Sequence, residues 1–175
     1  QLNAMSSAQL QAIETADVAA LATAQIAKLD TSAISTLSTA QVTALTSDQL
    51  NALSATQLNA MSSAQLRAIE TADVAALTTA QVVKFDTSAI SELSTAQIVA
   101  MGSAQFAALT AAQLKALSTA QLVVIDTVDV AALTTAQVAA LSSSAVAALT
   151  DTSTGQVAAL TSAQAAALSS AAVSG

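Results

Sequence analysis

An eight-residue unit repeats along almost the whole chain and limits the folds that the chain can adopt. The unit is clearest at 61–68, Met-Ser-Ser-Ala-Gln-Leu-Arg-Ala. A large apolar residue recurs at every eighth position from Met5 to Leu149 without a slip, and a second one follows five positions later in every octad from Leu10 to Val146. Any fold must therefore bury two apolar positions per octad, spaced alternately five and three residues apart.

Within each octad the residue types are those of a helix N-terminus. In the octad at 61–68, Ser62 is a favoured N-cap, and Gln65 can accept from the N-cap backbone N–H to complete a capping box. Met61 and Leu66 have the spacing of a hydrophobic staple. The sequence thus predicts that a new helix starts in every octad, with a bend at each Ser/Thr position.

This spacing argues against one continuous helix. Eight residues turn an ideal helix about 80° past two full turns, so the apolar pairs would spiral around the helix and form no face. A β-solenoid is the alternative fold, although Ala and Gln are poor strand residues and turn-forming Gly, Asn and Pro are scarce. We expect an all-α fold: a tight solenoid, or superhelix, of very short helices, one per octad, whose apolar pairs face a common axis.

A longer period lies on top of the octads, and the whole chain is predicted to be one array, 1–175. Residues 1–56 and 57–112 are identical at 41 of 56 positions on direct comparison. Inside this super-repeat the capping-box Gln is replaced at fixed places, which indicates that neighbouring octads differ in structural role. The replacements are Asp17, Asp73, Asp129, Ala33, Ala89 and Ala145. The super-repeats lie at 1–56, 57–112 and 113–149, followed by a register break at 150–156 and terminal octads at 157–175.

Three extra residues interrupt the octads at the register break, which we interpret as a surface loop or kink. Gly155 would permit a backbone conformation there that other residues resist. The tail, 163–175, is rich in Ala and Ser and is expected to fray. The chain opens at the Gln position of an octad, so we expect it to be a piece of a longer array.

Composition excludes several classes of protein. The chain is 54% hydrophobic and 9% charged and has no Cys, His, Trp, Tyr or Pro, which argues against disorder and against a disulfide or thiolate-metal scaffold. The net charge is −7, and the four basic residues are too scattered to follow a nucleic acid backbone. Every uncharged octad still carries Ser, Thr or Gln, so no membrane span is expected. Without a base to activate Ser or Thr, we expect no enzyme, no catalytic residue and no cofactor.

Acidic residues gather at the predicted helix starts, with Asp30 and Asp86 at N-cap positions. We interpret them as caps and as favourable charges at the positive end of the helix dipole. Calcium binding is the alternative, because acidic pairs recur once in every super-repeat and could converge between coils, although no Gly-containing calcium loop is present. The candidate calcium ligands are Glu14, Asp17, Glu70, Asp73, Asp126 and Asp129.

The stretch Leu-Thr-Thr-Ala-Gln-Val-Ala-Ala-Leu at 133–141 resembles the short repeats of very large, Ala/Thr-rich secreted or surface proteins of bacteria. The resemblance covers nearly the whole chain. It implies an extracellular or cell-surface array with a structural or adhesive role, and it assigns no functional residue.

Two functions remain open. The first is a structural repeat protein, a segment of an extracellular filament, stalk or adhesin spacer that stacks its repeats and self-associates head to tail. The second is a binding module that displays a site for carbohydrate, ice or calcium on the solenoid surface. Regular rows of hydroxyl groups motivate the ice-binding version, since they could order water.

Overall fold

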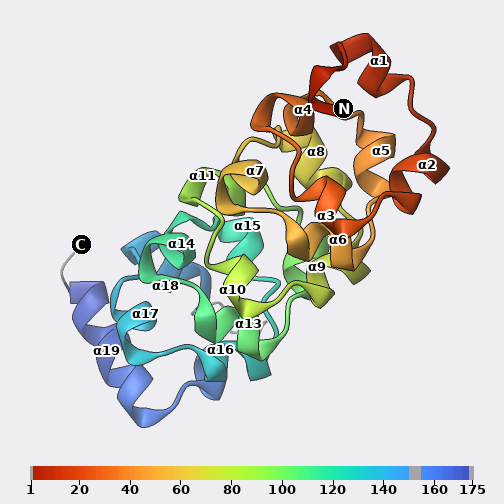
Figure 1. The fold of residues 1–175 in the computed structure, drawn as a ribbon. Coiled ribbons are helices and arrows are strands. Elements are labelled where there is room, and N and C mark those ends of the chain that lie inside the picture. The colour runs from red at the N-terminus through yellow and green to blue at the C-terminus, as the bar shows by residue number, and fades with distance from the viewer. Residues whose placement is uncertain (1, 150–154, 174–175) are drawn as a thin grey trace. The chain divides into compact units, whose positions relative to one another are not determined.

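The computed structural model describes residues 2–149 and 155–173 (Figure 1). These residues form nineteen short α-helices and two 3₁₀ helices, and they contain no strand. The all-α prediction is confirmed, and the β-solenoid alternative is wrong for this part of the chain.

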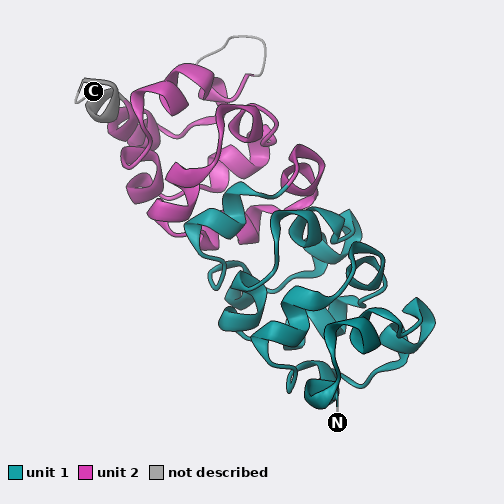
Figure 2. Cartoon of the chain, turned by 90° about the horizontal axis from the view of Figure 1, so that it is seen from above, with its two compact units in different colours: residues 1–93 teal, residues 94–175 magenta. Residues whose placement is uncertain are grey.

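The chain divides into two compact units, residues 1–93 and 94–175 (Figure 2). The boundary falls inside the second super-repeat. Unit 1 contains η1 (Leu2–Ala4), α1 (Ser7–Gln11), α2 (Thr15–Ala20), α3 (Thr23–Ile26), α4 (Thr31–Thr36), α5 (Thr39–Thr43), α6 (Ser47–Ala52), α7 (Ala55–Asn59), α8 (Ser63–Ala68), α9 (Thr71–Ala76), α10 (Thr79–Val82) and α11 (Thr87–Ser91). Unit 2 contains α12 (Thr95–Ala100), α13 (Ser103–Ala108), α14 (Ala111–Ala116), α15 (Thr119–Leu122), α16 (Thr127–Ala132), α17 (Thr135–Ala139), α18 (Ser143–Leu149), η2 (Val157–Ala159) and α19 (Ser162–Val173).

The helices stay short because extended residues separate each helix from the next. Leu53, which ends α6, has φ −66° and ψ 140°, and Ser54, the N-cap of α7, has φ −74° and ψ 165°. The Ser54 hydroxyl accepts from the N–H of Gln57 at 3.3 Å, and the Ser54 N–H donates to Gln57 Oε1 at 2.8 Å. The predicted capping box is therefore present, and the bend includes the apolar residue before the cap as well as the cap itself.

Helices α1 to α6 and α12 to α15 each pack against the third helix after them in the chain. In unit 1, α1 contacts α4, α2 contacts α5, α3 contacts α6, and the series continues to α6 with α9. In unit 2, α12 contacts α15, α13 contacts α16, and α14 contacts α17. Helices three octads apart are therefore neighbours in successive turns of a solenoid, as Figure 1 shows within each unit.

Both apolar positions of the octad face the interior. Leu50, Leu53 and Leu58 expose 0%, 1% and 0% of their surface, and every second-position residue from Leu10 to Val146 is buried. Burial of such a side chain stabilises the folded state by about 1.5–3 kcal/mol. A single octad buries only two, so it depends on its neighbours for stability.

The register break and the terminal octads differ from the rest. Gly155 has φ +67°, the left-handed conformation expected of glycine, while residues 150–154 lie outside the described residues. Beyond the break, α19 continues for twelve residues without a bend after Leu168, so the prediction of one helix per octad is wrong there. Position 172 holds Ala in place of the capping-box Gln, as positions 33, 89 and 145 do, although a new helix starts at each of those three. The helix continues to Val173, through most of the tail predicted to fray.

Candidate functional site: the glutamine ladder between turns

The glutamine of the capping box joins its own helix to the helix four octads earlier. In α7, Gln57 Oε1 accepts from the N–H of Ser54, while Gln57 Nε2 donates to the carbonyl oxygens of Ile26 at 3.1 Å and Leu29 at 2.7 Å. Ile26 ends α3, and its carbonyl also accepts from the N–H of Leu29 at 3.1 Å, in the turn that follows the helix. One side chain therefore satisfies the start of one helix and the end of another.

We call this set of side chains the glutamine ladder. Each member donates from Nε2 to the carbonyls of two apolar residues three positions apart, the second of one earlier octad and the first of the next, and each is almost fully buried. Buried amides need such partners, because an unpaired one costs about 1–3 kcal/mol. The members are Gln41, Gln49, Gln57, Gln65 and Gln81 in unit 1, and Gln137, Gln156 and Gln164 in unit 2.

Ladder spacing gives the size of a turn. Gln65 Nε2 donates to the carbonyls of Ile34 and Leu37, which lie 31 and 28 residues earlier, in the fourth and the third octad back. Packing between helices joins octads three apart. A turn therefore holds between three and four octads, and the shorter ladder separation corresponds to three and a half. Two such turns make seven octads. Because a turn does not hold a whole number of octads, an octad returns to the same position within a turn only after seven octads, which accounts for the super-repeat.

The register break leaves the ladder bonding unchanged. Gln156 Nε2 donates to the carbonyls of Leu122 at 2.9 Å and Ile125 at 2.7 Å, which lie 34 and 31 residues earlier. Both separations are three residues longer than those of Gln137, which match the rest of the ladder. The chain thus accommodates its three extra residues at the break, and helix packing resumes afterwards.

In two octads without a ladder glutamine, an asparagine from an earlier octad accepts from the N-cap N–H instead. Ala89 replaces the Gln of α11, and the exposed N–H of its N-cap, Asp86, donates to Asn59 Oδ1 at 2.9 Å. Asn59 Nδ2 also donates to the carbonyl of Lys84 at 3.0 Å. Asn3 makes the equivalent bonds to Asp30 and Lys28, one super-repeat earlier.

Aspartate fills the glutamine position in a different way. Asp73 Oδ1 accepts from the Ser47 hydroxyl at 2.5 Å, and Asp129 Oδ1 accepts from the Ser103 hydroxyl at 2.6 Å. Each serine lies 26 residues before its aspartate. At Asp73 and Asp129, and at Ala33 and Ala89 with their asparagines, the replacements are therefore alternative ways of bonding one turn to the next.

The six calcium candidates lie in pairs at the starts of α2, α9 and α16. Asp126 caps α16 through the N–H of Val128 at 2.8 Å, and Asp73 and Asp129 are bonded to serines as described above. Among the described residues, no three His, Cys, Asp or Glu side chains are placed to hold a metal ion together. The structure therefore brings no set of these carboxylates into a calcium-binding arrangement.

The capping interpretation of the acidic residues is only partly right. Asp30 and Asp86 accept from the N–H of Ala33 and Ala89 at 2.8 Å. Glu14 and Glu70 stand at the N-caps of α2 and α9 but make no capping hydrogen bond, so that prediction is wrong for them. Glutamate is not among the favoured N-cap residues, unlike the shorter Asp, Ser and Thr.

A second set of bonds between turns was not predicted from the sequence. At the seventh position of the octad, which Arg67 occupies in 61–68, polar side chains donate to the carbonyl of the residue 25 positions later. Asn51, for example, donates to the Ala76 carbonyl at 3.1 Å. The sequence signal is the concentration of polar residues at this position up to Arg67, followed by mainly Ala and Val. The donors are Asn3, Gln11, Thr43, Asn51, Asn59 and Arg67.

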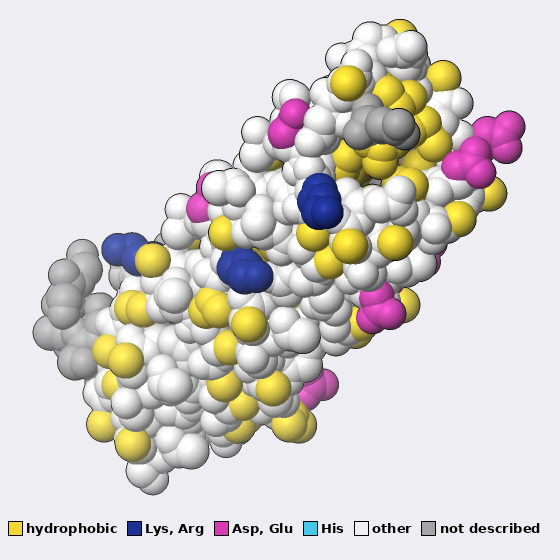
Figure 3. All heavy atoms as spheres, in the orientation of Figure 1, with side chains coloured by type: hydrophobic (Ala, Val, Ile, Leu, Met, Phe, Trp, Pro, Cys, Tyr) yellow, Lys and Arg dark blue, Asp and Glu magenta, His cyan; other side chains and the backbone are white. Residues whose placement is uncertain are grey.

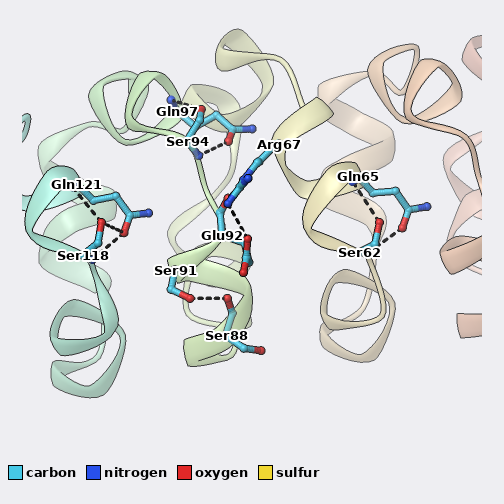
Figure 4. A network of polar contacts seen from close by, with 10 residues as sticks. All are labelled: Ser62, Gln65, Arg67, Ser88, Ser91, Glu92, Ser94, Gln97, Ser118 and Gln121. Carbon is cyan, nitrogen blue, oxygen red and sulfur yellow. Dashed lines mark hydrogen bonds and ion pairs between the residues drawn. The ribbon is translucent and has the colours of Figure 1, made fainter.

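The surface carries few charges. On the face shown in Figure 3, acidic and basic side chains are sparse among uncharged polar and apolar ones. Arg67 pairs with Glu92 at 2.9 Å between α8 and α11, and Figure 4 shows this pair beside the Ser62–Gln65 capping box. The two side chains are 60% and 36% exposed, and an ion pair so open to solvent stabilises a protein by less than about 1 kcal/mol. None of the described helices has the length and apolar character needed to cross a membrane.

Short helices that repeat every eight residues and bond only to neighbouring turns define a solenoid repeat protein. The chain belongs to the ALTTAQ repeat family, and the six letters of that name stand unbroken at 76–81 and 132–137. A search of curated proteins and a search of solved structures found nothing similar. The family model matches six overlapping stretches, 1–31, 10–47, 44–79, 66–103, 98–127 and 122–152.

The first prediction concerns the ladder itself. Gln57→Glu keeps an oxygen for the capping box but turns the Nε2 donor into a carboxylate oxygen that faces two carbonyls. We expect a loss of roughly 2–4 kcal/mol in the free energy of unfolding, measured by urea titration at pH 7.

Gln9→Glu is the matched control for this variant. Gln9 forms the same capping box in α1, but no ladder bond. Because a negative charge at a helix start is favourable, we expect a change of less than about 0.5 kcal/mol there. Equal losses in both variants would show that the ladder adds nothing beyond helix capping.

The second prediction tests the exchange of glutamine for asparagine. Asn59→Ala removes the bonds to Asp86 N–H and Lys84 O, and we expect it to destabilise the protein by about 1–2 kcal/mol. Adding Ala89→Gln should recover most of that loss, because the introduced amide oxygen can accept from the Asp86 N–H. Thermal melts of both variants measure the effect, and a double variant no more stable than Asn59→Ala would contradict the exchange.

The third prediction concerns pH. The N–H of Ala33 and the Ser32 hydroxyl lower the pKa of Asp30 below its usual 3.8, and Ala89 and Ser88 do the same for Asp86. The carboxylates therefore stabilise the folded state above the unfolded pKa, and this contribution is lost as pH falls through the lower, folded pKa.

We expect unfolding midpoints in urea to drop below about pH 4. The double variant Asp30→Asn/Asp86→Asn retains a capping oxygen without a titrating proton, so its drop should be smaller. An identical pH profile for both proteins would exclude the two caps as a source of the acid sensitivity.

Proposed function

We propose that this chain is a segment of a structural array on or outside the cell, which serves as a spacer, stalk or filament. The observation that carries the proposal is the ladder: successive turns are joined by one side chain type to main-chain carbonyls. Because carbonyls are the same in every octad, turns can be added without a new interface. The length of such a solenoid is then set by the number of octads.

The chemistry of the interior and surface supports a structural role. The ladder glutamines and most apolar pairs are used in packing. The acidic pairs that motivated a calcium site lie at separate helix starts. The uncharged Ser, Thr and Ala surface is compatible with an exposed spacer.

Head-to-tail stacking of copies is part of this proposal. In the first turn, Met5, Ile13 and Leu21 are half-buried, whereas the equivalent residues from Leu29 to Leu149 are buried. A further turn in front of them, from the same polypeptide or from another copy, would cover these side chains and bring its carbonyls to Gln9 and Gln25.

The test of the spacer role is a chain that contains a second copy of residues 57–112 inserted after residue 112. This insertion adds seven octads and keeps the register. We expect small-angle X-ray scattering to show a longer maximum dimension with an unchanged cross-section. A wider particle of unchanged length would contradict the proposal.

Localisation needs its own experiment. Antibodies against the purified chain should label intact cells of its source, and protease added to those cells should remove the signal. Labelling only after the cells are opened would contradict an external role. A calcium-dependent rise in the melting temperature of the purified chain would favour the binding-module alternative.

A further inference from the structure

We propose that the solenoid is extensible: under tension it detaches one turn of three and a half octads at a time and recoils in the same steps. The proposal rests on the proposed spacer role, since a spacer fixed at both ends carries tension. It is argued from three features of the described residues: the reach of the bonds between turns, the length of the helices and a gap in the ladder.

The bonds between turns reach no further than the adjacent turn. The ladder of unit 1 joins residues 28–31 apart, as Gln57 does with Leu29 and Ile26. The second set joins residues 25 apart, as Asn51 does with Ala76. Tension applied to the two ends therefore loads the turns in series, and a turn that detaches removes one interface only.

A detached turn does not persist as separate helices. The helices from α1 to α18 contain four to seven residues each, and helices shorter than about 12 residues are marginal in water even in Ala-rich sequences. Their apolar pairs also lose the cover of the neighbouring turn. Detachment of one turn thus releases its whole length as extended chain, about 90–100 Å for 28 residues.

Unit 1 contains a gap in the ladder at Ala89. A Gln at this position would reach the carbonyls of Leu58, in the fourth octad back, and of Met61, which begins the third octad back. In its place the structure has a cavity of about 220 Å³ lined by residues that include Met61, Ser62, Ser88 and Ala89. The contact between α11 and α7 therefore lacks two ladder bonds, and we expect it to open at lower force than the contacts made by Gln57, Gln65 and Gln81.

The test is single-molecule force spectroscopy on the whole chain, with Gln1→Cys and Gly175→Cys as handle sites. The chain has no cysteine of its own, so these attachments are unique. We expect several transitions, each adding about 90–100 Å of contour length, and the same steps on relaxation. A single transition that releases the whole chain would overturn the proposal, and so would steps of one octad, about 25–30 Å.

Two variants make the assignment specific. Gln57→Glu should lower the force of one step without changing the step length, whereas Gln9→Glu, which alters a capping box without a ladder bond, should leave all forces unchanged. Ala89→Gln should raise the lowest force. Unchanged forces in Gln57→Glu and Ala89→Gln would show that the ladder does not hold the turns.

The chain with the second copy of 57–112 provides a check that does not depend on point variants. Its seven extra octads should add two steps of the same length. A larger single step would contradict turn-by-turn detachment. One cooperative transition would leave the spacer role standing, whereas failure to label intact cells would remove the spacer role and leave the stepwise extension intact.

Discussion

The structure depends on a glutamine amide that satisfies two helix ends at once. A helix of four to seven residues leaves most of its backbone N–H and C=O groups without partners inside the helix. In Gln57, as in most ladder members, Oε1 accepts from an N–H at the start of its own helix and Nε2 donates to carbonyls at and just after the end of another. Because both functions sit on one buried side chain, helix capping and the stacking of turns are coupled.

The exceptions show how firmly the backbone groups must be paired. Where Ala89 removes the glutamine, Asn59 from the preceding turn accepts from the same N-cap N–H. The octad of α10 has both an asparagine bonded to it and its own glutamine. Asn51 Oδ1 accepts from the Thr78 N–H in place of Gln81 Oε1, which has no partner. The sequence repeats every seven octads because residues that bond to each other lie in different turns. A replacement at one such residue needs a matching replacement at its partner.

Each of the chain's few residue types has its own role in this structure. Leu, Ile and Val fill the interior, Gln joins the turns, Ser and Thr start the helices, and Ala keeps adjacent helices close. Almost every octad of the ALTTAQ repeat array is occupied by these structural tasks.

The octad pattern alone determined the secondary structure, the capping boxes and the buried apolar positions, because these depend on residues within a few positions of one another. The number of octads per turn, the second role of Gln65 and the bonding of Asp73 to Ser47 were decided only by tertiary structure. Each of them joins residues from different turns, and nothing local distinguishes a glutamine that caps its own helix from one that also reaches the next turn.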